Sequence, residues 1–332
     1  MMMQSIGDLA RGFVLERQTT RLKSDIGRMT QALGSGRVVD AARHLGGNTA
    51  PLAAIDAAIA RAEAHKGALA DLGRRAGTMQ TVLAALDRAT APVRATAVAL
   101  GPDPSPGQIA LAATEALGRF EDAVALVNTR DASRSIFAGA ATDSDALAAP
   151  AVILGQLRAA IGPIDSMPGD AVAEAVRTWF AAPTGFAAAA WLGDTTMAGP
   201  VAAQRGQAIA VDTTALDPAI RKTFEGLALA VLAGEATAAG ATLLGEAAAS
   251  LTAAADGRAL LAGRIGLTEA RIADAAAQHG AEASALAIRR NSLTEADPFA
   301  TASALTNLQD RLETVYAVTA RLSRLTLADF LR

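Results

Sequence analysis

The feature that most constrains this chain is the spacing of apolar residues in the stretch that follows Pro298. Leucine, valine and threonine side chains recur there at alternating intervals of three and four residues, the heptad spacing of a helix that pairs with another helix. We therefore predict a long terminal helix whose apolar stripe needs helical neighbours to cover it. The stripe comprises Leu305, Leu308, Leu312, Val315, Thr319 and Leu322, and Leu325, Leu327 and Phe330 extend its apolar character.

A second stripe lies between residues 6 and 33, near the other end of the chain. Its apolar residues are again three or four apart, and a small offset in phase along it indicates a stutter in one helical seam. Gly34-Ser35-Gly36 ends the predicted helix. We expect the two terminal stripes to pack together and to serve as an assembly seam. The residues that this stripe contributes are Leu22, Ile26, Met29 and Leu33.

Glycine and proline divide the chain between the two stripes. Helical spacing predicts helices from about 51 to 100 and from 108 to 129, and a very long helix from about 241 to 290. Asp217-Pro218 and Asp297-Pro298 are typical helix starts. Residues 135–216 differ, because short apolar runs at 136–139 and 208–211 predict strands, while 169–182 predicts a short helix.

These patterns predict a mainly α fold. We expect a long antiparallel coiled-coil helical bundle formed by the N- and C-terminal regions, with a small inserted α+β domain. In this division, residues 1–45 and 291–332 form the terminal assembly helices, residues 46–134 and 217–290 form a helical rod, and residues 135–216 form an outer domain.

Composition excludes several classes of function. Hydrophobic residues make up 51% of the chain and aromatic residues only 3%, a mixture rich in small and aliphatic side chains that favours close-packed helices. A formal net charge of −3 offers no positive excess for a phosphate backbone, so no nucleic-acid partner is expected. The apolar runs are far shorter than the roughly 20 residues of a membrane span, and residues 1–8 do not form a Sec signal peptide.

Residues capable of chemistry are sparse. The chain has no cysteine and only 3 histidines, His44, His65 and His279, which are scattered without a metal-ligand spacing. No phosphate-binding loop or nucleophile motif is present. The aromatic residues Trp179, Phe180, Phe186 and Trp191 are interpreted as a core cluster rather than as the lining of a ligand pocket. We expect no enzyme, no catalytic residues, no metal and no cofactor.

Three segments resemble the flagellin family, which includes the flagellin-like hook-associated proteins. Ile26–Val38 resembles the end of the family's first helix, with Gly36 and Arg37 at the motif positions. This sequence lacks the residue usually found between them, and the family's common D-D-P/A loop is absent. Asn128–Gly139 is similar to the turn into the family's middle domain, with Asn128, Phe137, Ala138 and Gly139 at the motif positions. Residues 293–327 are similar to the terminal helix of the family.

The resemblance implies a structural subunit of the bacterial flagellum. Such a protein is exported unfolded through the flagellar type III channel without a Sec signal, and it assembles outside the cell through its terminal helices. The motif at 128–139 favours a subunit at the hook–filament junction. Its implied partners are further copies of itself, a neighbouring hook-associated protein on the hook side, flagellin on the filament side and an export chaperone. A flagellin filament subunit and a cytoplasmic helical adaptor module remain the alternatives.

Overall fold

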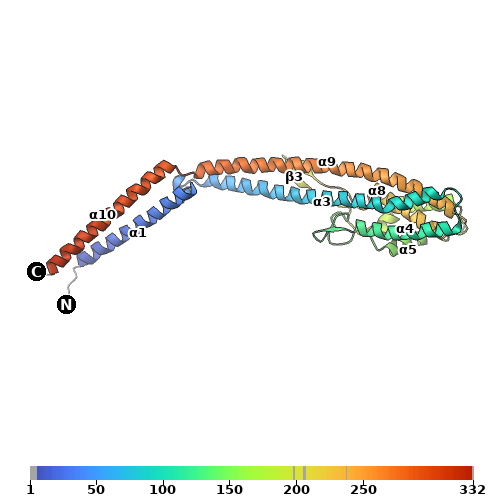
Figure 1. Ribbon diagram of the computed structural model, residues 1–332, viewed down its shortest axis with the longest axis horizontal. Coiled ribbons are helices and arrows are strands. Elements are labelled where there is room, and N and C mark those ends of the chain that lie inside the picture. The colour runs from blue at the N-terminus through green and yellow to red at the C-terminus, as the bar shows by residue number, and fades with distance from the viewer. Residues whose placement is uncertain (1–5, 197–198, 205–206, 237, 331–332) are drawn as a thin grey trace. The chain divides into compact units, whose positions relative to one another are not determined.

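The computed structural model describes residues 6–196, 199–204, 207–236 and 238–330. The chain is mainly helical, with 74% of residues in helices, 5% in strands and two small antiparallel sheets (Figure 1). It divides into two compact units, residues 1–63 with 281–332 and residues 64–280. Two long helices, α3 (Ala50–Leu100) and α9 (Gly240–Thr294), contribute residues to both units. Among the described residues, no helix is long and apolar enough to span a membrane.

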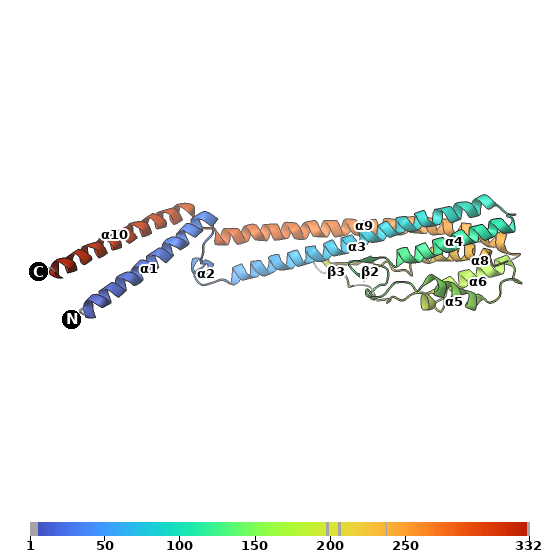
Figure 2. The same cartoon turned by 60° about the horizontal axis from the view of Figure 1, so that its bottom comes forward.

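The first unit is dominated by α1 (Ile6–Ser35) and α10 (Pro298–Phe330), which lie side by side and run in opposite directions (Figures 1 and 2). A short helix, α2 (Ala41–His44), follows α1. Gly36, at φ +67°, ends α1 in the left-handed conformation that glycine adopts at low cost. Asp297 begins α10, because its carboxylate accepts hydrogen bonds from the backbone of Phe299 at 2.8 Å and Ala300 at 3.1 Å.

The second unit is built on α4 (Pro106–Val127) and α8 (Pro218–Ala233), which pack against each other and against residues 64–100 of α3 and 240–280 of α9. Sequence signals fix the helix starts, since Ser105 and Gln108 form a capping box on α4 and the Asp217 side chain caps α8. Small residues permit close approach, because a Cβ added to Gly226 would lie 2.7 Å from Leu251.

Residues 130–209 carry the remaining elements. The first sheet pairs β1 (Arg130–Asp131) with β2 (Arg134–Ser135), and the second pairs β3 (Val201–Gln204) with β4 (Gln207–Ile209). The helices are α5 (Pro150–Ile161), α6 (Gly169–Ala181) and α7 (Phe186–Ala189). The core of this region is continuous with that of α4 and α8, since the ring centroids of Phe186 and Phe224 lie 5.9 Å apart and those of Phe224 and Phe120 lie 5.4 Å apart.

The structure corrects the strand assignments. Residues 136–138 form bends rather than a strand, and Gly139 makes only an isolated bridge with Asp194. Three consecutive side chains there are buried, so the segment threads through the core instead of alternating between two faces. The second predicted strand is shorter than expected, because Ala210 and Val211 lie outside β4. Helices α5 and α7 were not predicted, whereas Trp179, Phe180 and Phe186 are core residues as expected, and Trp191 is half-buried.

Two charged side chains, Arg258 and Glu225, lie in the interior of the second unit. Arg258 is 3% exposed and donates hydrogen bonds to the Thr223 hydroxyl at 2.6 Å, the Asp87 carboxylate at 2.8 Å and the Thr90 hydroxyl at 3.1 Å. Burial lowers the pKa of Arg258, and the hydrogen bond and charge of Asp87 oppose that shift. The network compensates a buried charge with three acceptors from two neighbouring helices.

Candidate functional site

The two predicted stripes lie on α1 and α10, the helices that pack together in the first unit. Leu22 and Val315 are the best covered of their members, at 8% and 9% exposure. Ile26, Met29, Leu305, Leu308 and Leu312 are half-buried. Lys23 of α1 also approaches α10, with its ammonium 5.9 Å from the ring centroid of Tyr316. The side chains of Leu322, Leu325 and Phe330 lie outside the described residues.

One member of the predicted stripe has a different environment. Leu33 is 42% exposed, whereas the adjacent Ala32 is buried. On the other helix the stripe begins earlier than predicted, because Thr301 is buried four residues before Leu305. Its spacing of four residues before Leu305 is the sequence signal that could have placed Thr301 in the stripe. Small side chains at Ala32, Ala296 and Thr301 therefore occupy the buried positions where α1 ends and α10 begins.

Large apolar side chains are exposed on both helices of this pair. Phe13 on α1 is 61% exposed, and Phe299 on α10 is 82% exposed. Val14, Tyr316 and Val318 are exposed as well. These side chains expose apolar surface to solvent, as Leu111 and Leu260 of the second unit also do at 73% and 74% exposure.

A groove opens where α1, α2 and the first turns of α10 meet. Its volume is about 390 Å³, and most of its wall is aliphatic. Polar side chains stand at its edge, where Arg28 pairs with Asp25 and Arg43 lies 3.6 Å from Asp40. The groove is therefore suited to an apolar side chain. The residues that line it are Arg28, Met29, Ala32, Val38, Val39, Asp40, Arg43, His44, Ala296, Asp297, Ala300, Thr301 and Ala304.

The motif residues Gly36 and Arg37 join the end of α1 to the segment that precedes α10. The Gly36 carbonyl accepts a hydrogen bond from Ala296 at 3.0 Å, and Arg37 pairs with Glu295 in an antiparallel bridge. The Arg37 guanidinium also donates to the side-chain oxygen of Asn291. These contacts connect residues more than 250 positions apart in the sequence, the Arg37–Asn291 separation being 254. The motif thus has a local structural role at this joint.

The other motif residues fix the chain where it leaves α4. Asn128 caps that helix, and its side-chain amide exchanges hydrogen bonds of 2.8 and 2.9 Å with the backbone of Leu147. Phe137 and Ala138 are fully buried. Gly139 has φ +65°, and a Cβ at this position would lie 2.0 Å from the Asp194 carbonyl oxygen. Only glycine fits there, both for its φ and for this close approach.

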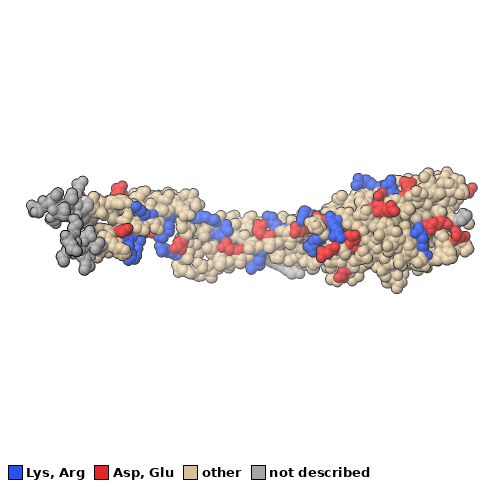
Figure 3. All heavy atoms as spheres, turned by 90° about the horizontal axis from the view of Figure 1, so that it is seen from below, with Lys and Arg blue, Asp and Glu red and all other residues tan. Residues whose placement is uncertain are grey.

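Side chains that could hold a metal ion do not gather in the described part of the chain. No set of three histidine, aspartate or glutamate side chains is placed to hold a metal ion among those residues. Figure 3 shows lysine and arginine interspersed with aspartate and glutamate on the face it presents. Comparison with known proteins finds no family and no curated protein that matches this chain.

Proposed function

We propose that this protein is a structural subunit of the bacterial flagellum that joins the hook to the filament. The observation that carries the proposal is the incomplete burial of the terminal unit, in which both stripes are only partly covered and large apolar side chains are exposed. The segments that resemble the flagellin family add to it, because two of the three lie in the terminal helical regions that this family uses for assembly.

In this proposal α1 and α10 form an antiparallel coiled coil that is completed by neighbouring subunits. A pair of helices can bury only one stripe on each partner, so the faces that carry Phe13 and Phe299 stay open in a single chain. Contacts with several neighbours would cover those faces. Burial of a large apolar side chain contributes about 1.5–3 kcal/mol, so such contacts with several neighbours favour association.

The geometry of such contacts favours an extended assembly. An exposed aromatic side chain on one surface and an apolar groove on another are different patches, and contacts between different patches build open helical assemblies unless the rotation closes a ring. The groove beside α2 and the exposed Phe299 are patches of this kind. Neighbouring copies, a hook-associated protein on one side and flagellin on the other are the proposed partners.

The same surface explains why an export chaperone belongs to the proposal. Exposed apolar side chains on the terminal helices promote aggregation before assembly, and a partner that covers them in the cell prevents it. The proposed route is export through the flagellar type III channel, followed by assembly outside the cell. Helices that order only when neighbours arrive are compatible with export of an unfolded chain.

A flagellin filament subunit is the second candidate, because it would use the same terminal arrangement. The junction function is preferred because the 128–139 segment resembles the turn typical of junction proteins. A cytoplasmic helical adaptor is the third candidate. It would form discrete complexes inside the cell rather than a layer of the flagellum.

Gold-labelled antibodies against residues 150–215, applied to intact flagella, separate the candidates by position in the electron microscope. The junction proposal expects a single band at the distal end of the hook. Label along the whole filament would make the protein a flagellin, and absence of label from flagella would favour the adaptor.

A pair of variants tests whether the terminal stripe drives incorporation. Leu312→Asp places a charge in the half-buried stripe, whereas Gln309→Asp places the same charge on an exposed position of the same helix. We expect Leu312→Asp to abolish the hook-end band and Gln309→Asp to retain it. Normal incorporation of both variants would contradict assembly through α10.

A further inference from the structure

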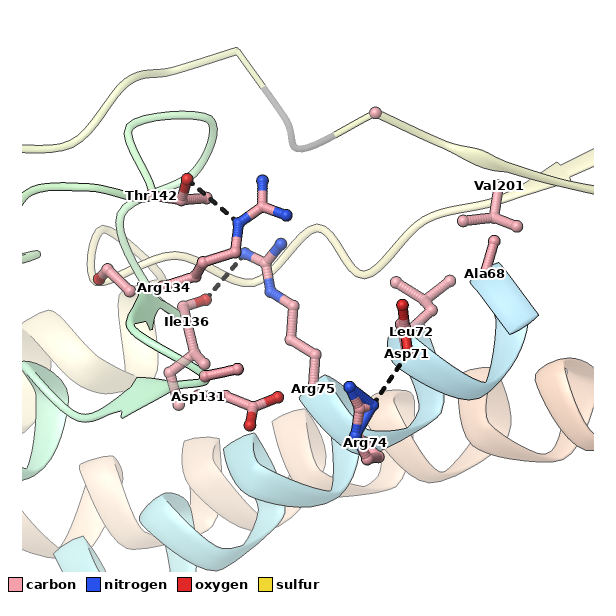
Figure 4. Close-up of a pocket in the computed structure, with 13 residues that line it drawn as sticks. Ala68, Asp71, Leu72, Arg74, Arg75, Asp131, Arg134, Ile136, Thr142 and Val201 are labelled. Atoms are coloured by element: carbon pink, nitrogen blue, oxygen red, sulfur yellow. Dashed lines mark hydrogen bonds and ion pairs between the residues drawn. The ribbon is translucent and has the colours of Figure 1, made fainter. Parts of the chain in front are cut away.

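A second hollow, distinct from the groove beside α2, lies in the second unit. Its volume is about 430 Å³, and it opens between α3, the β1–β2 hairpin and the residues around Val201 (Figure 4). Charged side chains face it from two elements. Asp71, Arg74 and Arg75 come from α3, and Asp131 and Arg134 come from the hairpin.

Some charged side chains in this hollow have no ion-pair partner among the described residues. Arg74 is paired with Asp71, at 3.0 Å between a guanidinium nitrogen and a carboxylate oxygen. Arg75 and Arg134 lie with their guanidinium groups close together in Figure 4, and neither forms an ion pair within the part of the chain that the structure describes. Asp131 lines the hollow but forms no ion pair with either of them in that part. Two like charges therefore face the same space.

Few protein groups in the described residues accept hydrogen bonds from the two guanidinium groups. Arg75 donates to the Ile136 carbonyl at 2.9 Å, and its Nε is buried without a partner in the described structure. Arg134 makes only a long contact of 3.4 Å with the Thr142 hydroxyl. Each guanidinium has five N–H donors, so several donors remain for a ligand. Ser135, which is buried and also lines the hollow, has a hydroxyl without a partner in the described residues.

The repulsion between the two arginines is a cost that a bound anion would remove. Burial lowers the pKa of Arg75, and the neighbouring charge of Arg134 lowers it further. An anion placed between them would favour both charged forms and would accept hydrogen bonds from both groups. Because the hairpin positions Arg134 through β2 and α3 positions Arg75, the two donors are held on separate backbone elements.

We propose that this hollow binds a phosphate group, either as the free ion or as a monoester, between Arg75 and Arg134. Two guanidinium groups on separate elements match the several oxygens of a tetrahedral oxyanion, whereas a planar carboxylate is satisfied by one guanidinium. The volume of the hollow leaves room for an organic substituent on the phosphate. This proposal is independent of the flagellar function.

Isothermal titration calorimetry on the full chain tests the proposal, with inorganic phosphate as the probe at constant ionic strength in chloride. We expect saturable binding at one site. Arg134→Gln should weaken it at least tenfold, and Arg74→Gln, which alters a paired arginine in the same wall, should change it less than threefold. Absence of saturable binding to the unaltered protein, or equal losses in the two variants, would overturn the proposal.

Further titrations identify the class of ligand, and a second variant serves if Arg134→Gln does not fold. Acetate should bind at least tenfold more weakly than phosphate, and equal affinity would overturn the choice of a phosphate group. Tighter binding of phenyl phosphate than of inorganic phosphate indicates a monoester as the ligand, while weaker binding indicates the free ion. Arg134→Lys keeps the charge and loses the planar fork, so it should bind phosphate more weakly than the unaltered protein if Arg134→Gln does not fold.

Discussion

The two units of this protein bury their large apolar side chains to different extents. In the second unit, Phe120, Phe224 and Leu227 are fully buried among four or more helices. In the first unit, the best covered large side chains of the α1–α10 pair are Leu22 and Val315, and each keeps some contact with solvent. Composition contributes to the difference, because α1 has two alanines among its 30 residues whereas α4 has six among its 22. The number of neighbours around each helix contributes as well, because two helices alone cannot enclose a core.

The largest effect should come from the core of the second unit. Phe224→Ala removes a fully buried ring that contacts two other aromatic residues, and we expect it to lower the free energy of unfolding by about 3–5 kcal/mol. Urea unfolding followed by circular dichroism measures the change. Leu260→Ala, at an exposed position of α9, is the control and should change stability by less than about 0.5 kcal/mol. Equal effects of the two variants would contradict the description of this core.

The buried charge of Arg258 in the second unit gives a smaller effect. Asp87→Ala leaves the Arg258 guanidinium without its only carboxylate partner among the described residues, and we expect a loss of about 1.5–3 kcal/mol. Asp71→Ala removes an exposed partner of Arg74 and should cost no more than about 0.5 kcal/mol. Comparable losses in urea unfolding would show that Arg258 is not held as the structure describes.

The first unit provides a test of register at the end of α1. Ala32 is buried and Leu33 is exposed, so Ala32→Leu should overpack the joint and cost about 1–3 kcal/mol, while Leu33→Ala should cost less than about 0.5 kcal/mol. Thermal unfolding of the full chain compares them. If Leu33→Ala lost more stability than Ala32→Leu, Leu33 would be the buried member of the stripe, as the sequence pattern predicts.

The smallest effect on folding should accompany the largest effect on association. Phe299→Ser changes a side chain that is 82% exposed, so we expect a stability change within about 0.5 kcal/mol but weaker self-association in sedimentation velocity. Leu260→Ser makes a matched change on the second unit and should leave association unaltered. If both variants associate equally, the exposed face of the terminal unit does not mediate contacts between copies.

Helix positions could be predicted from the sequence because their signals are local. Asp217-Pro218 and Asp297-Pro298 start α8 and α10, and both aspartates accept backbone hydrogen bonds as such residues should. Helix α5 was missed because Ala149 precedes it and supplies no side-chain cap. The run at 136–139 was misassigned as a strand because continuous burial in a core crossing has the same sequence appearance as a buried strand.

Features that depend on contacts distant in sequence could not be predicted. Arg75 and Arg134 are ordinary charged residues in their own segments, and only the fold places them in one hollow. The choice between Ala32 and Leu33 is likewise invisible to spacing rules, since both positions fit an interval of three or four residues after Met29. It is decided by the close approach of α1 to the segment that contains Ala296.

Hydrogen exchange of the backbone amides, compared between the free subunit and intact flagella, tests the central claim most directly. In the free chain, amides of α1 and α10 should exchange much faster than those of α4 and α8, because the terminal pair lacks a complete core. Assembly should slow exchange in α1 and α10 and leave α4 and α8 unchanged. Equal protection of all four helices in the free subunit, or no gain in α1 and α10 on assembly, would contradict the account.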